Sequence, residues 1–381
     1  MAIDTPVKSG LEGVIAAQTR LSSVDGQAGE LIIAGFAVEA LAGQAEFEET
    51  IHLLWYDALP TARQLTALRE RLAERRALPQ ATLDLLRTAA AQQAPTMDVL
   101  RMATSTLSLH APGAASDDPQ HDALTLVACF PTIVAAYWRL RRNQEPIAPR
   151  ADLSHAANYL YMLSGEEPSA ERVRGLETYL NTVVDHGLNA STFTARVIVS
   201  TQSDMISAIT GAIGALKGPL HGGAPGPALD MVFEIGAAER AEAYLRAKLE
   251  RGERLMGFGH RVYKVRDPRA DVLSAAAERL YRTDGDTRLY DLARHVEQTA
   301  LALLNEYKPG RRLQTNVEFY TALLLYGLDL PTEMFTPTFA ISRVAGWTAH
   351  CFEQIALNRI IRPQSVYSSE KDRRWVALEK R

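Results

Sequence analysis

The segment Met256–Ala270, MGFGHRVYKVRDPRA, concentrates side chains that could bind and polarise an anionic molecule. It contains one histidine and four basic residues: His260, Arg261, Lys264, Arg266 and Arg269. Because the whole chain has a formal net charge of −4, an anionic ligand must be bound by a local cluster rather than by the general surface. The same net charge argues against nucleic-acid or membrane-surface binding. The simplest alternative for this segment is a solvated basic loop.

Two further histidines lie beside glycines. His221 lies within GPLHGGAPG, at Gly218–Gly226, after a segment with a helical pattern. Glycine permits close backbone approach and unusual dihedral angles, so the ring is predicted to project from a tight turn. The alternative is a helix stop that happens to contain a histidine. His186, in DHGLNAST, is a third candidate, and its neighbour Asp185 is interpreted as a helix-end or turn residue rather than half of a charge relay.

One carboxylate and two arginines complete the candidate set. Glu318 follows Asn316, a good helix cap, and therefore occupies a first helical turn. The helix dipole favours carboxylates there and would keep this one ionised, as a general base requires. Arg343 flanks the apolar stripe of a later helix, and Arg362 follows at the end of that helix. Such arginines usually pair with a carboxylate, either of the protein or of a ligand.

The remaining composition limits the classes of protein. The motifs GxxxxGK[ST], GxGxxG, HExxH and CxxC are absent, and the three histidines lack metal-ligand spacing, so no metal site is predicted. The two cysteines, Cys129 and Cys351, lie in apolar surroundings, which favours a reduced, cytoplasmic compartment. The start, MAIDTPVKSGLEG, lacks the regions of a signal peptide, and no apolar run is expected to reach membrane-spanning length.

The elements that must position these residues are predicted to be nearly all α-helical. Within Asp286–Tyr307, apolar residues recur at three- and four-residue steps, and Thr336-Pro337 is predicted to open another helix. Six more helices are expected, at Glu46–Tyr56, Ser154–Ser164, Ser169–Val184, Asp204–Leu216, Arg240–Arg251 and Ala270–Arg282.

Strand and loop signals are few. Short strands are expected near Gly13–Arg20 and Gly29–Phe36. The stretches Pro112–Asp122 and Arg141–Arg150 are predicted to be loops. Residues 364–381, beyond Pro363, are charged and poorly periodic, which predicts either disorder or an arm that orders on a partner subunit.

Seven motifs, taken together, are more specific than any one residue. In chain order they are GLEGVIAAQTRLSSVDGQAGEL, DHGLNASTFTAR, GPLHGGA, MGFGHRVYKVRDPRA, NVEFY, FAISRVAGW and RPQS. This series resembles the citrate synthases, from about Gly10 to Pro363. The length is similar to that of the short bacterial and archaeal form, without the N-terminal β-rich extension of longer bacterial enzymes. That absence argues against the allosteric NADH site associated with the longer form.

The resemblance implies a mostly helical, two-domain fold and a homodimer. The small domain would comprise residues 221–325, and the large domain residues 1–220 and 326–381, which also form the dimer interface. Ligands would bind in the cleft between the domains. Closure of the small domain would exclude water and assemble the site.

The resemblance also implies a reaction and a role for each candidate residue. Citrate synthases condense acetyl-CoA, a co-substrate rather than a permanently bound cofactor, with oxaloacetate, and then hydrolyse citryl-CoA to citrate and CoA at the entry to the tricarboxylic acid cycle. Glu318 matches the catalytic base. His221 matches the residue that stabilises the enol oxygen, in the manner of an oxyanion-hole donor. His260 matches the residue that polarises the ketone of oxaloacetate.

The basic residues match two binding roles. Four residues match the set that binds carboxylates, with Arg362 supplied by the partner subunit: His186, Arg269, Arg343 and Arg362. Three residues fall where the family binds CoA phosphates: Lys264 and, beside each other, Arg311 and Arg312. Arg261 and Arg266 are assigned neither role and are interpreted as solvated or structural charges.

Two positions depart from the family pattern. The base is usually aspartate in an NVDFY-like motif, and Glu318 is one methylene longer, which matters because proton abstraction is sensitive to placement. The change could slow the reaction, or accompany a shifted backbone or a different acyl-CoA. Ala34 replaces a frequent arginine. Three alternatives therefore stand beside a citrate synthase: a 2-methylcitrate synthase that uses propionyl-CoA, a ligand-binding relative with weak catalysis, and a histidine-based metallohydrolase.

Overall fold

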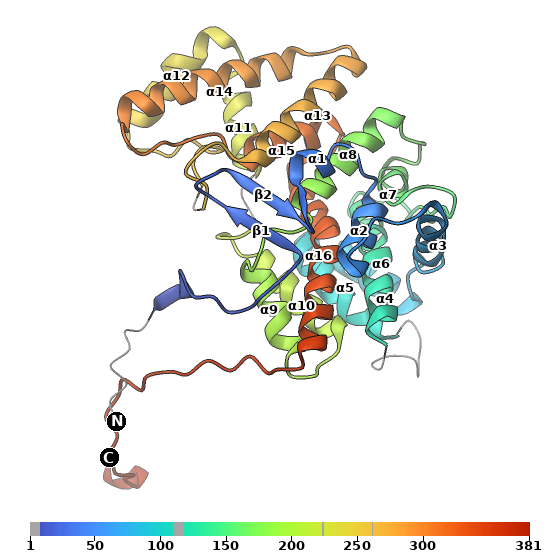
Figure 1. The fold of residues 1–381 in the computed structure, drawn as a ribbon, viewed down its shortest axis with the longest axis vertical. Coiled ribbons are helices and arrows are strands. Elements are labelled where there is room, and N and C mark those ends of the chain that lie inside the picture. The colour runs from blue at the N-terminus through green and yellow to red at the C-terminus, as the bar shows by residue number, and fades with distance from the viewer. Residues whose placement is uncertain (1–7, 110–117, 223–224, 261) are drawn as a thin grey trace.

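The computed structural model describes residues 8–109, 118–222, 225–260 and 262–381. Over these residues the chain forms sixteen α-helices and one three-stranded antiparallel sheet, which confirms the nearly all-α prediction (Figure 1). The first eight helices are α1 (Val38–Leu41), α2 (Phe47–Tyr56), α3 (Ala62–Ala73), α4 (Gln80–Ala91), α5 (Thr96–Thr106), α6 (Pro119–Leu140), α7 (His155–Ser164) and α8 (Ala170–Val183). The other eight are α9 (Ala190–Val199), α10 (Met205–Leu216), α11 (Pro225–Ile235), α12 (Ala238–Glu250), α13 (Pro268–Asp284), α14 (Arg288–Tyr307), α15 (Val317–Gly327) and α16 (Phe335–Leu357).

The sheet lies near the N-terminus. Strands β1 (Ser22–Asp25) and β2 (Glu30–Ile33) form a hairpin with Ser22 opposite Ile33, and β3 (Phe36–Ala37) pairs with the other edge of β2. The Asp25 carboxylate accepts hydrogen bonds from the Gln27 and Ala28 amides, at 2.8 and 2.9 Å, which fixes the hairpin turn. Leu31 and Ile33 are fully buried, so one face of β2 belongs to the core.

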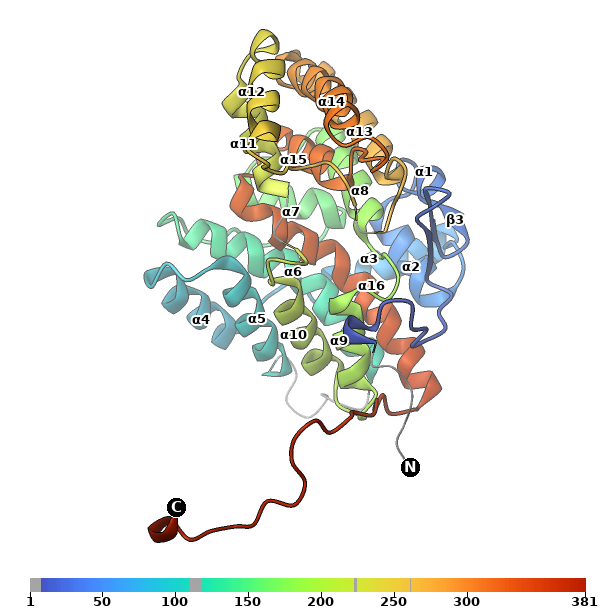
Figure 2. The same cartoon turned by 90° about the vertical axis from the view of Figure 1, so that its left-hand side faces the viewer.

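Helix α16 forms the centre of the core. It crosses the molecule and packs against α2, α6, α8, α9 and α10, with nearly every residue as far as Cys351 buried (Figure 2). One face of α16 holds the end of α8. The Ser342 hydroxyl donates to the Leu180 carbonyl at 2.5 Å, and the Arg343 Nε donates to the Val183 carbonyl at 2.9 Å. These bonds satisfy carbonyls that a helix end leaves unpaired, and they fix the direction of the chain after α8.

Most of the sequence-based helix predictions are confirmed to within a few residues, and the residues 141–150 contain neither helix nor strand, as expected. Four expectations are wrong. The stretch Gly13–Arg20 contains no strand, since the first strand begins at Ser22. Thr336-Pro337 does not open α16 as cap and first residue, because the helix begins at Phe335 with Met334 at the cap position. Residues 119–122 are helical, while residues 112–117 of the same expected loop lie outside the described ones.

The fourth wrong expectation concerns α6, which is long and apolar enough to cross a membrane. Within its most apolar stretch, 89% of the residues are buried, which is typical of a core helix. A helix that is buried on all sides carries no one-sided apolar stripe, so its periodic signal is weak. Helix α6 was accordingly not predicted from the sequence, and α1, α3, α4, α5, α9 and α11 were not predicted either.

The chain after α16 leaves the helical body. Residues 359–381 run as an extended arm that ends in a short 3-10 helix, Leu378–Lys380 (Figures 1 and 2). Large apolar side chains along this arm are exposed, among them Ile360, Tyr367 and Trp375. Both sequence-based interpretations of the tail, disorder and an arm that docks on a partner, remain predictions.

Gly346 of α16 provides a test of the contact with the end of α8. A Cβ at this position would lie 2.2 Å from the Val184 carbonyl oxygen, so Gly346→Ala is expected to lower the free energy of unfolding by about 1–3 kcal/mol. Gly214 in α10 is the matched control, because a Cβ there would meet its nearest neighbour, Arg101 Cδ, only at 3.9 Å. Urea unfolding of the two variants measures the difference, and equal midpoints would refute the close approach.

Candidate active site

A cavity of about 720 Å³ gathers most of the residues that the sequence singled out. Its walls come from the segments after α8 and α10, the basic segment before α13, the start of α15 and one face of α16. Seven of the ten candidate residues line it: His186, His221, His260, Arg269, Arg311, Glu318 and Arg343. Residues that are up to 157 positions apart in the chain therefore face one space.

His260 is held in one tautomer by the main chain. Its Nδ1 lies 3.1 Å from both the Val262 and the Tyr263 main-chain nitrogens, and a main-chain N–H can only donate. Nδ1 is therefore unprotonated, and the proton of the neutral ring resides on Nε2. Burial, together with the neighbouring Arg269, lowers the pKa of His260 to about 4. At neutral pH this ring is an uncharged hydrogen-bond donor.

His221 lies in the tight turn that the sequence predicted, with its main-chain N–H donating to the Gly218 carbonyl at 2.9 Å. Its Nε2 lies 2.8 Å from Ser191 Oγ and 3.4 Å from the Ser191 main-chain nitrogen. The main-chain N–H requires an acceptor, so Nε2 accepts and the proton resides on Nδ1. Burial, with Arg343 nearby, lowers the pKa of His221 to about 4. Sequence analysis missed Ser191, although it lies in the DHGLNAST motif.

His186 contacts a tyrosine that the sequence analysis did not select. The Nε2 of His186 lies 3.1 Å from the Tyr263 hydroxyl, and its ring meets the His260 ring edge-on at 6.0 Å. Burial and then Arg269 lower the pKa of His186 well below its ordinary value. All three histidines of the cavity are thus neutral near pH 7.

Two arginines supply the positive charge, in different ways. Arg269 is 5% exposed and donates from Nε and Nη2 to the two oxygens of Asp267, at 3.0 and 2.8 Å, which fixes its guanidinium plane. Arg343 is 2% exposed, and its Nε donates to the Val183 carbonyl at 2.9 Å; among the described residues no carboxylate lies within ion-pair distance. Burial lowers its pKa to about 10, so it stays protonated. A buried cation that faces a cavity without an ion pair is a binding site for a ligand anion.

The negative charge of Asp185 partly offsets the positive charge of Arg343. It lies two residues after the last residue of α8, near the helix end as expected, but it is fully buried and both of its oxygens lie 3.2 Å from His350 Nε2. It also accepts a hydrogen bond of 2.5 Å from the Ser22 hydroxyl. Burial alone would raise the pKa of Asp185, but His350, Arg343 and Ser22 together hold it below the ordinary value. The interpretation as a simple turn residue therefore missed its pairing with a distant histidine.

Glu318 is the second residue of α15, and the Asn316 side chain caps the helix by accepting from the Glu318 N–H at 3.0 Å. The predicted cap is confirmed. Burial raises the pKa of the Glu318 carboxyl, against the opposing effect of Arg269, and its ionisation at neutral pH stays a prediction. The raised pKa makes this carboxylate a stronger base than an exposed one.

Three candidates do not line the cavity. Lys264 is exposed, Arg312 lies beside Arg311 but outside the lining, and Arg362 lies on the extended chain after α16. Two cations that the sequence analysis missed, Arg254 and Lys308, line the cavity together with Arg311. Neither residue belongs to a motif that the sequence analysis selected. Arg254 lies just before the basic segment, and Lys308 was interpreted only as part of the stop after α14.

Three residues from the sequence analysis remain: Arg261, Arg266 and Ala34. Arg266 pairs with Asp271 at 2.6 Å and with the buried Glu297 at 2.7 Å, so its charge is structural rather than solvated. Arg261 lies outside the described residues. Ala34 has a positive φ of 43° just before β3 and does not line the cavity.

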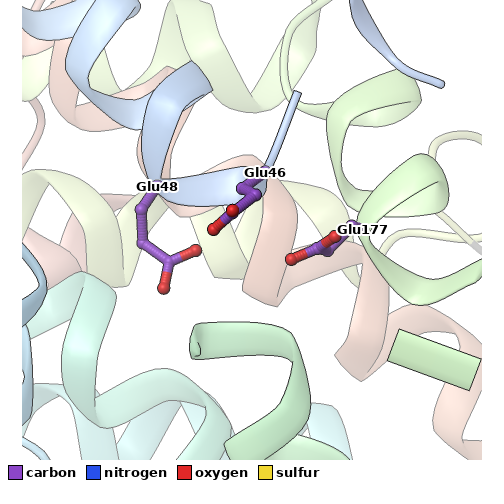
Figure 3. A group of neighbouring side chains, drawn as sticks. All are labelled: Glu46, Glu48 and Glu177. Carbon is purple, nitrogen blue, oxygen red and sulfur yellow. The ribbon is translucent and has the colours of Figure 1, made fainter. Parts of the chain in front are cut away.

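One group of carboxylates has the proximity of a metal site, but it lies outside the cavity. Glu46, Glu48 and Glu177 place one oxygen each within 4.8 Å of the others (Figure 3). Arg174 pairs with Glu177 at 3.3 Å, and Arg69 pairs with Glu46. These arginines already balance much of the negative charge, so the arrangement is that of an ion-pair cluster.

A cavity that combines neutral histidines, buried arginines and one carboxylate defines a site for polycarboxylate chemistry, and comparison with known proteins gives the family. Residues 10–364 match the family model described as citrate synthase, C-terminal domain, so the chain belongs to the citrate synthase family. The citrate synthase of Haloferax volcanii is 41% identical over 98% of this chain and 99% of its own length. The 2-methylcitrate synthase of Mycobacterium tuberculosis is 40% identical over 96% of this chain and 92% of its own length.

Solved structures agree. The citrate synthase of Pyrobaculum aerophilum superposes with a TM-score of 0.88 at 38% identity, covering all of this chain and 96% of that one. The enzyme of Thermoplasma acidophilum, solved as a ternary complex with carboxymethyl coenzyme A and oxaloacetate, has a TM-score of 0.86 at 30% identity, covering 98% and 99%. The chain is a transferase of the citrate synthase type.

The neutrality of the cavity histidines can be tested directly by NMR. With pKa values of about 4, the rings of His221 and His260 are expected to keep neutral imidazole shifts throughout pH 6–8 and to titrate only below that range. Their signals are assigned with His221→Asn and His260→Asn. A midpoint near the ordinary 6.5 for either ring would contradict the electrostatics described above.

Proposed function

We propose that this protein condenses acetyl-CoA with oxaloacetate and hydrolyses the resulting citryl-CoA to citrate and CoA. The observation that carries the proposal is the convergence of Glu318, neutral His221 and neutral His260 on one cavity. Removal of a proton from the methyl group of a thioester needs a base and a donor to the carbonyl oxygen at the same time. The three groups supply these functions, and family membership supports the assignment.

The first step forms the nucleophile. Glu318 takes a proton from the methyl carbon, while the Nδ1–H of His221 donates a hydrogen bond to the thioester oxygen, on which negative charge develops. A neutral ring that donates, rather than a charged one that protonates, is suited to stabilise an enol. Burial raises the pKa of Glu318 toward that of a useful base.

The second step forms the carbon–carbon bond. Arg269, Arg343 and His186 bind the carboxylates of oxaloacetate, and the Nε2–H of His260 donates to its ketone oxygen and makes the ketone carbon electrophilic. The enol carbon attacks that carbon, and the ketone oxygen takes up one proton to become a hydroxyl, which balances the proton that Glu318 removed from the methyl group. Water then adds to the thioester carbonyl, and the carbon–sulfur bond breaks to release citrate and the CoA thiol.

The cations at one side of the cavity fit the CoA phosphates. Arg254, Lys308 and Arg311 all line the cavity, and all come from segments that flank the basic segment and the start of α15. This set replaces part of the one expected from the sequence, in which Lys264 and Arg312 accompanied Arg311. The binding of a CoA analogue and oxaloacetate by the Thermoplasma acidophilum enzyme supports both ligand assignments.

The proposal includes a homodimer with closing domains. Helices α11–α15 gather at one end of the molecule (Figure 1) and correspond to the small domain, residues 221–325, that closes over the cavity. Arg362 lies on the arm beyond α16 and does not line the cavity of its own subunit, which fits donation to the partner's site. The fourth carboxylate-binding group would then come from the second subunit.

Replacement of the base tests the mechanism. Glu318→Gln is expected to lower kcat for CoA thiol release by about 10²- to 10⁴-fold, because the amide cannot accept the methyl proton. Oxaloacetate affinity, measured by calorimetry, should stay close to that of the parent protein. Glu318→Asp is the control, because it keeps a carboxylate at one methylene less. Parent protein that binds oxaloacetate but releases thiol only at background would instead identify a ligand-binding relative.

One observation favours a second candidate for the acyl group. A 2-methylcitrate synthase matches this chain at 40% identity, and the same residues would serve propionyl-CoA. One extra methylene changes kcat/KM by about 10- to 200-fold when a pocket is fitted to the smaller group. We expect kcat/KM for acetyl-CoA to exceed that for propionyl-CoA by this order, and a preference for propionyl-CoA would assign the second function.

A further inference from the structure

The turn between β1 and β2 lies directly against the segment that carries His260. A Cβ on Gly26 would lie 2.2 Å from the Val262 carbonyl oxygen, a distance that no real side chain could adopt. The Gly26 carbonyl also accepts a hydrogen bond of 2.8 Å from the Lys264 N–H. A Cβ on Gly29 would lie 2.6 Å from Val265 Cγ2. The turn and the basic segment are therefore in contact at the level of their main chains.

The contact acts on the peptide group that orients the catalytic ring. The Val262 carbonyl and the Tyr263 N–H belong to one planar peptide unit, so the position of one fixes the other. That same N–H donates to His260 Nδ1 at 3.1 Å and so helps to place the ring proton on Nε2. Any group that pushes the Val262 carbonyl away from the turn must also tilt the Tyr263 N–H away from His260.

Tyr263 links the same peptide to a second residue of the cavity. Its hydroxyl lies 3.1 Å from His186 Nε2, and its ring packs against the His260 ring at 5.0 Å. The residue is only 3% exposed, so it has little freedom to shift independently of its main chain. Displacement of this one peptide unit would therefore disturb two of the groups assigned to oxaloacetate.

We propose that Gly26 is a positioning residue for oxaloacetate activation: the absence of a side chain there lets the β1–β2 turn hold the Val262–Tyr263 peptide that orients His260. Gly26 itself does not line the cavity and touches no substrate. The inference rests on the proposed function for the role of His260. It assigns a task to the DGQAG turn, which comes from the far end of the chain.

The test compares two glycines of the same N-terminal region. Gly26→Ala is expected to lower kcat/KM for oxaloacetate by about tenfold or more, with the KM for acetyl-CoA changed by less than about twofold. Gly43→Ala is the matched control, because a Cβ there would meet no atom within 4 Å, and it should behave as the parent protein. Melting temperatures of both variants show whether either is globally unfolded.

A second readout separates positioning from a general structural effect. In protein labelled with ¹⁵N-histidine, the imidazole shifts report which ring nitrogen is protonated. The parent protein and Gly43→Ala should hold His260 in the Nε2–H form, whereas Gly26→Ala should give a mixture of both forms. Unchanged kinetics and an unchanged tautomer in folded Gly26→Ala would overturn the proposal.

A substitute variant covers misfolding of Gly26→Ala, and a separate readout covers failure of the proposed function. If Gly26→Ala does not fold, Asp25→Ala takes its place, because Asp25 is exposed and its carboxylate only braces the turn amides. It should cause a smaller change in the same direction, and no change would overturn the proposal. If the parent protein and Gly43→Ala both release no thiol, the proposed function fails. The positioning role is then judged by the His260 tautomer and by calorimetric oxaloacetate binding, and equal results for both glycine variants would reject it.

Discussion

The structure depends on how two buried arginines are tolerated. Arg343 and Arg196 are 2% and 1% exposed, and each unpaired cation at that depth would be costly. Asp185 offsets the first from behind, and Glu353 pairs with the second at 2.8 Å. His350 lies between them, with Nε2 facing Asp185 and Nδ1 facing Arg196 at 3.0 Å. This network joins α8, α9 and α16 and leaves the cavity side of Arg343 for a ligand.

The same arrangement divides the work inside the cavity. The positive potential of Arg269 and Arg343 favours anions, and together with burial it keeps the nearby histidines uncharged. Main-chain N–H groups then decide which nitrogen of the His221 and His260 rings carries the proton. Charge is thus supplied by groups that do not titrate near neutral pH, and hydrogen-bond donation by groups that stay neutral. The Glu318 carboxylate, whose pKa is raised by burial, is compatible with the arginines and with the neutral histidines. Its proposed task, to accept one proton, requires only that it is ionised before the reaction.

Most of the features predicted from the sequence are local in the chain, and contacts across the chain were missed. The Asn316 cap, the turn at His221 and the predicted helices follow from neighbouring residues and are confirmed, whereas the amphipathic helices α3, α4 and α5 were missed although their pattern is local. The pairing of Asp185 with His350 joins positions 165 residues apart, and no local pattern signals it. Helix α6 was not predicted, because burial on all sides removes the periodicity that marks a helix. Motif resemblance supplied the cavity residues, which spacing alone left ambiguous.

The attachment of the C-terminal arm has a consequence for how it finds a surface. The Gln354 amide donates to the Arg359 carbonyl at 2.8 Å, and the Ile361 N–H donates to Ser200 at 3.0 Å, so the arm is anchored at its first residues. Residues 362–381 can extend by roughly 65–70 Å from that anchor. If the arm docks as predicted, apolar side chains on such a tether, Trp375 at 81% exposure among them, would meet a surface within that reach at an effective concentration in the millimolar range. Weak contacts of the arm would then add up to stable attachment without any gain in intrinsic affinity.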